Sequence, residues 1–434
     1  MPELPRMRNR NCRTTLLAVL LALLCTSCVR TGDGGGDAGG GQDASIDPIT
    51  VGQREKSERK AAPSAGRTDR SSAGRTSLPS AERTDAPSAG RTDRSSTKRS
   101  DAPSVERVEV STLATDLEVP WSFAFLPGGD ALVTERDSGR LLRVSPSGDV
   151  REIQILPEAG SGEGGLLGVA VSPDYEEDRF VYAYYTTQRD NRVVRFRLGE
   201  KPEPILTGIP VNTFHDGGRI KFGPDGMLYV STGDAGDTEN SQDRNSLGGK
   251  ILRIEPDGSI PRDNPFPGNP VYSYGHRNVE GLAWDAQDQL FASEFGQNTW
   301  DEVNRIEAGE NYGWPEVEGK GGEDQGYVDP ITVWPTSEAS PSGAEVMVGG
   351  GIPQWEGDLF VAALRGERLW RLELDDRDQV VGRQKLLDGE VGRVRDVVQA
   401  PDGSLWVSTS NYDSYGSPVS DQDDRILRLA PAGE

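Results

Sequence analysis

Between residue 130 and the C-terminus, apolar and polar residues alternate in a series of short stretches that begin in turns. Two of these turns are Gly223-Pro224-Asp225-Gly226 and Pro401-Asp402-Gly403, and the stretches after them are rich in β-branched and aromatic residues. Alternation with a period of two, bounded by turn residues, predicts β-strands in hairpins. The six stretches begin at Asp130, Asp178, Gly226, Asp288, Gly357 and Gly403.

A second strand follows each stretch and carries an arginine between hydrophobic-leaning neighbours. The six arginines lie 52 to 66 residues apart, with a mean spacing of 57. A unit of this length holds a four-stranded sheet, and six such sheets placed radially form an all-β, six-bladed β-propeller. Residues 105–113 are expected to add a strand to the last blade and close the ring. We interpret the repeated arginines as structural; they are Arg143, Arg195, Arg253, Arg305, Arg371 and Arg428.

The first 28 residues have the pattern of an export signal. Four arginines precede an apolar run of nine residues, 16–24, which is too short to span a bilayer and fits the hydrophobic part of a signal peptide. The run ends in Cys25-Thr26-Ser27-Cys28, which resembles the cleavage motif of bacterial lipoproteins. We therefore expect an exported chain, anchored to the cell envelope by lipid on Cys28; plain secretion is the alternative.

Residues 29–104 are expected to form a disordered linker between this signal and the propeller, which would occupy residues 105–434. The linker is rich in Gly, Ser, Arg and Asp and contains the near-repeat SAGRTDR. It has almost no aromatic or branched apolar side chains, so it cannot bury enough surface to offset the entropy of folding.

Charge and cysteine usage exclude several functions. The whole chain carries a formal charge of −23, and residues 1–107 contribute +5, which leaves −28 for the rest. Such an acidic domain repels phosphate backbones, so we expect no nucleic-acid partner. All three cysteines lie within the first 28 residues, which excludes disulfides, cysteine-bound zinc and a thiol nucleophile from the rest of the chain.

Candidate chemistry begins with the two histidines of the chain, His215 and His276. His215 precedes a predicted blade strand, and Asp234 follows the same strand nineteen residues later. A neutral imidazole can accept a proton from a hydroxyl group, and a nearby carboxylate can orient the ring. If the two ends of this segment meet, they form a base and its orienting group; otherwise His215 fills a hydrogen bond within a loop. The blade spacing is widest between Leu228 and Leu359, so we expect the functional loops there.

Three other motifs carry candidate binding groups. A tight turn presents Arg277 and Asn278 next to His276, which suits a planar anion or simple loop packing. Arg393 and Arg395 lie on the same face of a strand entry, as anion ligands or as a solvated pair. The loop SEFGQNTWDEVN combines a glycine turn with carboxylates, which is the oxygen-rich surrounding that calcium prefers.

Taken in order, the motifs GEGGLLG, HDGGR, LGGKILRI, GHRN, SEFG, NYGWP and RVRD resemble the glucose/sorbosone dehydrogenase family. The resemblance extends from about Leu117 to Leu429. It implies an exported six-bladed propeller that binds pyrroloquinoline quinone (PQQ) and calcium and oxidises an aldose at its anomeric carbon to the lactone. The electrons would pass to an external acceptor.

The resemblance also implies roles for individual residues. His215 would remove the proton of the anomeric hydroxyl, with Asp234 supporting it, while hydride passes to the quinone. The backbone carbonyls of Gly296 and Gln297 would hold calcium. The remaining expected cofactor-binding residues are Glu163, Arg277, Asn278, Arg365, Arg393 and Arg395, with Arg365 in place of a lysine of the family.

Two departures leave alternatives open. Glucose-oxidising members of the family have Gln at the position of Glu163, and Phe295 also differs from their sequence. These changes favour a propeller that binds sugar without a cofactor. A calcium-dependent lactonase is a further alternative, although its chemistry requires carboxylates and amides around an axial metal. Three aromatic residues could stack on a sugar or simply pack; they are Trp300, Tyr312 and Trp314.

Overall fold

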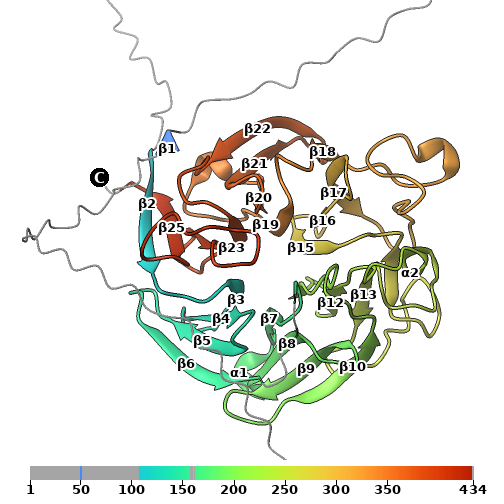
Figure 1. Ribbon diagram of the computed structural model, residues 1–434, viewed down its shortest axis with the longest axis horizontal. Helices are drawn as coiled ribbons and strands as arrows, with labels where there is room; N and C mark the ends of the chain where they lie inside the picture. The colour runs from blue at the N-terminus through green and yellow to red at the C-terminus, as the bar shows by residue number, and fades with distance from the viewer. Residues whose placement is uncertain (1–48, 51–106, 157–159, 161, 433–434) are drawn as a thin grey trace, which may run out of the picture. The chain divides into compact units, whose positions relative to one another are not determined.

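The structure of the protein is a computed structural model that describes residues 49–50, 107–156, 160 and 162–432. The predicted signal peptide and nearly all of the predicted linker lie outside the described residues. The described chain forms six antiparallel sheets arranged in a ring (Figure 1), which confirms the predicted six-bladed β-propeller. No helix among these residues is long and apolar enough to cross a membrane.

Each blade contains four consecutive strands, except that the sixth is completed by the start of the domain. Blade 1 holds β3 (Pro120–Phe125), β4 (Ala131–Glu135), β5 (Arg140–Val144) and β6 (Val150–Ile155). Blade 2 holds β7 (Leu166–Val171), β8 (Phe180–Thr186), β9 (Asn191–Arg197) and β10 (Glu203–Ile209). Blade 3 holds β11 (Ile220–Phe222), β12 (Leu228–Ser231), β13 (Lys250–Ile254) and β14 (Val271–Tyr274).

The remaining blades follow the same order. Blade 4 holds β15 (Val279–Trp284), β16 (Leu290–Glu294), β17 (Trp300–Ile306) and β18 (Thr332–Pro335). Blade 5 holds β19 (Pro341–Val346), β20 (Leu359–Ala363), β21 (Arg368–Leu374) and β22 (Val380–Leu386). Blade 6 holds β23 (Val394–Gln399), β24 (Leu405–Thr409) and β25 (Ile426–Pro431), with β2 (Arg107–Ala114) and β1 (Ile49–Thr50) from the N-terminal side.

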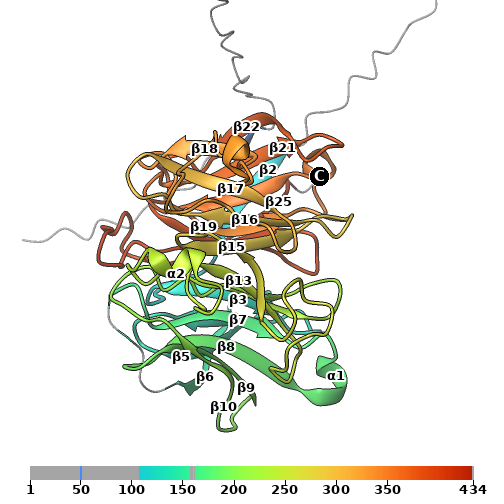
Figure 2. The ribbon, with the colours of Figure 1, turned by 90° about the vertical axis from the view of Figure 1, so that its right-hand side faces the viewer.

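Short helical turns lie in the connections between strands. The α-helices are α1 (Tyr175–Asp178) and α2 (Glu239–Gln242), and the 3₁₀ turns are η1 (Glu323–Gln325) and η2 (Pro353–Trp355). Figure 2 shows α1 and α2 toward opposite faces of the propeller. Neither helix contributes a large apolar face, because the core is built from the sheets.

The ring is closed by β2, as the sequence predicts. This strand pairs antiparallel with β25, from Val108 opposite Pro431 to Ala114 opposite Ile426. Val108 and Val110 are buried in the same apolar cluster as residues of β25 and of blade 5. Strands from the start and the end of the propeller domain therefore share one sheet, and blade 6 depends on both.

The repeated arginine of each blade has a structural role. In every blade it stands directly opposite a residue of the preceding strand, for example Arg253 opposite Tyr229. In four blades the guanidinium pairs with the aspartate of the turn that begins the hairpin, as Arg253 does with Asp225 at 2.9 Å. The register also shows which first-strand residues are equivalent: Ala131 and Val181, rather than Leu132 and Phe180, correspond to Leu228 of blade 3.

The innermost strands of the six blades are β3, β7, β11, β15, β19 and β23, and they surround the axis of the ring (Figure 1). Each is the first strand of its blade. Their N-terminal ends, together with the C-terminal ends of the second strands, therefore meet at one face of the propeller. Residues that lie just before an innermost strand or just after a second strand are thereby brought together from all six blades.

Candidate functional site

A cavity of about 540 Å³ lies where these strand ends meet. Nine of the ten residues to which the resemblance assigns a role line it, and the tenth, Asp234, contacts one of the nine. The nine are Glu163, His215, Arg277, Asn278, Gly296, Gln297, Arg365, Arg393 and Arg395; the other lining residues are Arg136, Glu280, Phe295, Ser340, Leu364 and Tyr415.

The expectation that the site lies between Leu228 and Leu359 is wrong in part. Only the fourth blade and the start of the fifth contribute cavity residues from that range, such as Arg277 and Ser340. His215 and Arg393 come from other blades, because the cavity is built by the strand ends of the whole ring. The length of the loops therefore predicts only part of a site that all six blades form.

His215 and Asp234 meet at the cavity. The Nδ1 atom of His215 lies 2.7 Å from Oδ1 of Asp234. The imidazole is 15% exposed, whereas the carboxylate is 1% exposed. Nε2 has no hydrogen-bond partner among the described residues, so it is the ring nitrogen that can serve a ligand. With a proton on Nδ1 donated to Asp234, Nε2 carries the lone pair.

Asp234 is itself held by two further donors. The backbone N–H of Gly236 donates to Oδ1 at 2.7 Å, and the indole Nε1–H of Trp314 donates to Oδ2 at 2.9 Å. Burial would raise the pKa of Asp234, but its hydrogen bonds with His215, Gly236 and Trp314 outweigh burial and hold that pKa below its usual range. The carboxylate is therefore ionised and fixed in position beside the imidazole.

The second histidine, His276, does not face the cavity. It is fully buried, with Nδ1 2.8 Å from Oε2 of Glu294 and Nε2 2.9 Å from the hydroxyl of Ser273. Its ring stacks on Tyr312 at a centroid distance of 4.6 Å. His276 and Tyr312 thus pack together beneath the turn whose next residues, Arg277 and Asn278, reach the cavity.

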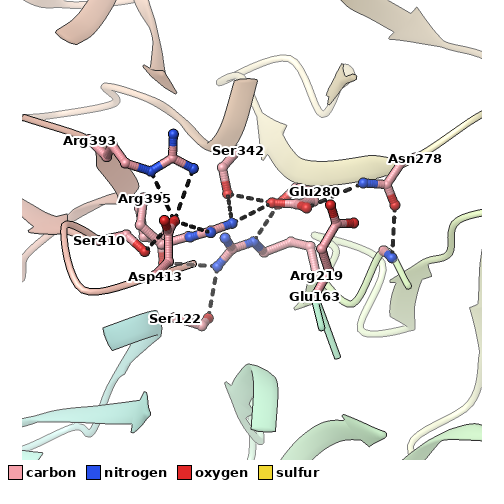
Figure 3. A network of polar contacts seen from close by, with 12 residues as sticks. Ser122, Glu163, Arg219, Asn278, Glu280, Ser342, Arg393, Arg395, Ser410 and Asp413 are labelled. Atoms are coloured by element: carbon pink, nitrogen blue, oxygen red, sulfur yellow. Dashed lines mark hydrogen bonds and ion pairs between the residues drawn. The ribbon is translucent and has the colours of Figure 1, made fainter. Parts of the chain in front are cut away.

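Arg393 and Arg395 are held by buried carboxylates (Figure 3). Asp413 accepts from Nε of Arg393 at 2.9 Å and lies 3.5 Å from Nη2 of Arg395. Nη1 of Arg395 donates to Glu280 at 2.8 Å. Burial raises the pKa of Glu280, while Arg395 opposes this rise. The two guanidinium groups are therefore fixed in place and largely neutralised before any ligand arrives.

Arg277 has fewer partners than these two arginines. Its Nη1 donates to the carbonyl of Phe295 at 3.2 Å, and its guanidinium lies over the ring of Trp314 at 5.5 Å. Burial lowers the pKa of Arg277. Nε of Arg277 and Nε of Arg395 are buried and have no hydrogen-bond partner among the residues that the structure describes. Each is an unused donor on a residue that lines the cavity.

The other three predicted binding residues differ in how firmly they are held. Oε2 of Glu163 accepts the backbone N–H of His215 at 2.8 Å, so this carboxylate anchors the histidine loop. Oδ1 of Asn278 accepts the N–H of Gly217 at 2.9 Å. Arg365 is exposed at the cavity and forms no ion pair with any described residue.

The loop that contains Gly296 and Gln297 connects β16 to β17. Oδ1 of Asp301 accepts the N–H of Gly296 at 2.9 Å, and Oε1 of Glu318 accepts the N–H of Gln297 at 2.8 Å. Burial would raise the pKa of Glu318, but the backbone donors lower it overall. Within the described ranges, no group of three His, Cys, Asp or Glu side chains could hold a metal ion. The resemblance assigns a cation in this loop to backbone carbonyls rather than to such a group.

Several residues of this site were not nominated from the sequence. Arg136 lines the cavity from blade 1 and is held by Asp137 at 2.6 Å, and Glu280 lies only two residues after the nominated Asn278. Trp314 was considered as a residue that could stack on a sugar, but its indole N–H donates to Asp234 instead. Neither Trp300 nor Tyr312 lines the cavity. The carboxylates that hold the arginines, Asp413 and Glu280, do not belong to any recognisable sequence motif. The sequence pattern therefore could not identify them.

Comparison with known proteins decides the family. The family model described as glucose/sorbosone dehydrogenase matches residues 117–416, from the turn before β3 to beyond β24. This chain belongs to the glucose/sorbosone dehydrogenase family. The resemblance seen in the motifs is thereby confirmed.

Three similar proteins illustrate the glucose/sorbosone dehydrogenase family. The PQQ-bound aldose sugar dehydrogenase of Streptomyces coelicolor is 52% identical with a TM-score of 0.69, and the match covers 74% of this chain and 98% of that one. An uncharacterised Synechocystis protein is 37% identical over 68% of this chain and 82% of its own. Quinoprotein glucose dehydrogenase B of Acinetobacter calcoaceticus is 30% identical over 68% of this chain and 84% of its own.

Proposed function

We propose that the protein is a PQQ- and calcium-dependent aldose dehydrogenase that oxidises the anomeric carbon of a sugar to the lactone. The observation that carries the proposal is that one cavity joins the His215–Asp234 pair to a group of arginines. The names of two similar proteins, a PQQ-bound aldose sugar dehydrogenase and a quinoprotein glucose dehydrogenase, support the same reaction class.

The cavity fits a planar quinone that bears carboxylates. Nε of Arg277 and Nε of Arg395 are buried donors that find no partner in the described part of the chain, which is a costly arrangement unless a ligand or water accepts from them. Arginine also binds carboxylates with paired, parallel hydrogen bonds. Arg277 and Asn278 would bind the quinone oxygens, and Arg393, Arg395 and the exposed Arg365 its carboxylates. The carbonyls of Gly296 and Gln297 would hold the calcium ion.

When bound, PQQ supplies the electrophilic carbonyl that accepts a hydride from C1 of the sugar. His215 takes the second hydrogen, which leaves the sugar as a proton. Its Nε2 accepts the proton of the anomeric hydroxyl, while the O–H bond electrons form the C1=O bond of the lactone. Asp234 keeps the proton on Nδ1 and stabilises the positive charge that develops on the ring.

Trp314 should affect turnover although it does not line the cavity. Substituting phenylalanine keeps an aromatic ring beside Arg277 but removes the N–H that binds Oδ2 of Asp234. A hydrogen bond to a charged group contributes about 1.5–3 kcal/mol, so we expect kcat to fall by about tenfold or more. Steady-state dye reduction would measure kcat, and PQQ titration should give an unchanged Kd. An unchanged kcat would show that the indole N–H does not support the dyad.

The function is tested by adding PQQ and Ca²⁺ to the purified protein and following dye reduction with a panel of aldoses. Reduction with at least one sugar is the expected result, together with a changed absorbance spectrum of PQQ on binding. No reduction with any sugar and no calorimetric binding of PQQ would refute the proposal. Sugar binding without PQQ binding would instead indicate a non-catalytic propeller, and lactone hydrolysis a lactonase.

We further propose that the protein is exported and carries lipid on Cys28, with electrons passing to an external acceptor. The support is the pattern of residues 1–28, which resembles a lipoprotein signal. Mass spectrometry of the mature N-terminus in the native host tests this directly. An acylated Cys28 is expected, whereas an unmodified N-terminus elsewhere would favour secretion.

A further inference from the structure

Two carboxylates bind the backbone N–H groups of the loop between β16 and β17. Five consecutive backbone N–H groups, from Gly296 to Trp300, donate to just two side chains. Asp301 takes the first, and a single oxygen of Glu318, Oε1, accepts the other four. The four distances, from Gln297, Asn298, Thr299 and Trp300 in turn, are 2.8, 3.1, 3.0 and 3.1 Å.

This arrangement sets the direction of the carbonyl groups. In a trans peptide the C=O of one residue points opposite to the N–H of the next. With the N–H groups of residues 296–300 turned toward Asp301 and Glu318, the carbonyls of residues 295–299 point away from them. One of these carbonyls has a visible partner, since the oxygen of Phe295 accepts from Nη1 of Arg277, a residue that lines the cavity. The carbonyl of Phe295 therefore turns toward a cavity residue, and the next four carbonyls point away from the two carboxylates as it does.

The loop leaves no room for a side chain at Gly296. A Cβ atom on Gly296 would lie 1.8 Å from the carbonyl oxygen of Trp300 and 2.9 Å from Oε1 of Glu318. Glu318 itself comes from the connection that follows β17, so it is a separate segment that supports the loop rather than a part of it.

We propose that Glu318 is the positioning residue of the calcium site: it orders the 295–299 carbonyls and directs those of Gly296 and Gln297 toward the ion. The inference rests on the proposed function only in assigning calcium to this loop. Two physical effects act together. The carboxylate fixes four peptide groups that would otherwise lack a common partner, and its negative charge attracts a cation on the far side of the same peptides. Groups that orient metal ligands in this way typically change metal affinity by about 10- to 100-fold.

The chain offers a matched control in Glu316. This residue lies two positions before Glu318, is exposed, and forms no hydrogen bond or ion pair with any described residue. Glu316→Gln therefore removes the same charge from the same neighbourhood without touching the loop. Glu318→Gln keeps an oxygen acceptor but removes the charge, and Glu318→Ala removes both.

The test is calorimetric titration of Ca²⁺ into the full-length protein and its variants, with and without PQQ. We expect Glu318→Ala to raise the Kd for Ca²⁺ by about 10- to 100-fold. Glu318→Gln should fall between this variant and the wild type, and Glu316→Gln should change the Kd by no more than about twofold. Hydrogen exchange in metal-free protein gives a second readout, because the amides of residues 297–300 should exchange faster in Glu318→Ala alone.

The outcomes separate this inference from the proposed function. If the wild type binds Ca²⁺ and Glu318→Ala binds it equally well, the role of Glu318 is wrong and the calcium site stands. Equal weakening by Glu316→Gln and Glu318→Gln, with unchanged amide exchange, would also overturn it, because charge alone would then explain the effect. A wild type that binds no Ca²⁺ would overturn both the calcium assignment and the role of Glu318, while PQQ binding and dye reduction would still test the rest.

Discussion

His215→Ala is expected to lower kcat by about 10²- to 10⁴-fold, the usual contribution of a general base. The variant should retain its fold, because the loop is held through the backbone N–H of residue 215 and the Oε2 atom of Glu163, not through the imidazole. Asp234 also keeps its bonds to Gly236 and Trp314. Turnover would be measured by dye reduction with saturating sugar.

Two controls make this result specific to proton transfer. The Kd of PQQ should change little in His215→Ala, because the arginines that would bind PQQ are held by other residues. Added imidazole should restore part of the lost rate, since the space left by the ring faces the cavity. Wild-type activity in His215→Ala would contradict the assignment of the base, and loss of PQQ binding would point to a structural role instead.

Removal of β2 is expected to cause the largest loss of stability. A chain that starts at residue 115 lacks the strand that pairs with β25 from Val108 to Ala114. It also loses the burial of Val108 and Val110, each worth about 1.5–3 kcal/mol, and it leaves β25 as an open edge. We expect the free energy of unfolding to fall by several kcal/mol relative to a chain that starts at residue 105. Denaturant unfolding followed by circular dichroism measures the difference.

Substitutions within β2 distinguish ring closure from a general effect of shortening the chain. Val108 is fully buried, so Val108→Asp should reproduce much of the loss, whereas Glu109 is exposed and Glu109→Ala should have little effect. Equal unfolding midpoints for the chains that start at residues 105 and 115 would show that the ring does not need this strand.

The fold was largely predictable because its signals are local. Alternation and turn residues mark each hairpin, and the arginine that recurs at Arg253 and its counterparts marks the second strand of each pair. The closing strand was predictable for a different reason: residues 105–113 form a strand pattern without a blade of their own. The pattern could not align the blades with one another to the exact residue, because it does not distinguish neighbouring apolar positions such as Ala131 and Leu132.

The site was only partly predictable because its contacts join distant segments. Scarcity of histidine drew attention to both His215 and His276, but only the fold shows that the second is enclosed by Glu294, Ser273 and Tyr312. Glu318 contacts a loop some twenty residues earlier in the chain, and no spacing rule connects the two. Side-chain contacts of this kind depend on how the strands are placed in the ring, and the periodicity of the sequence contains no information about that placement.

The carboxylates behind the arginines act before any cofactor binds. Asp413 and Glu280 already hold Arg393 and Arg395, so these side chains need not be ordered by an incoming ligand. Cofactor loading would then be a late event, separable from folding. Protein purified without its quinone should keep the geometry of the receptor and become active on simple mixing, with no refolding and no assembly factor.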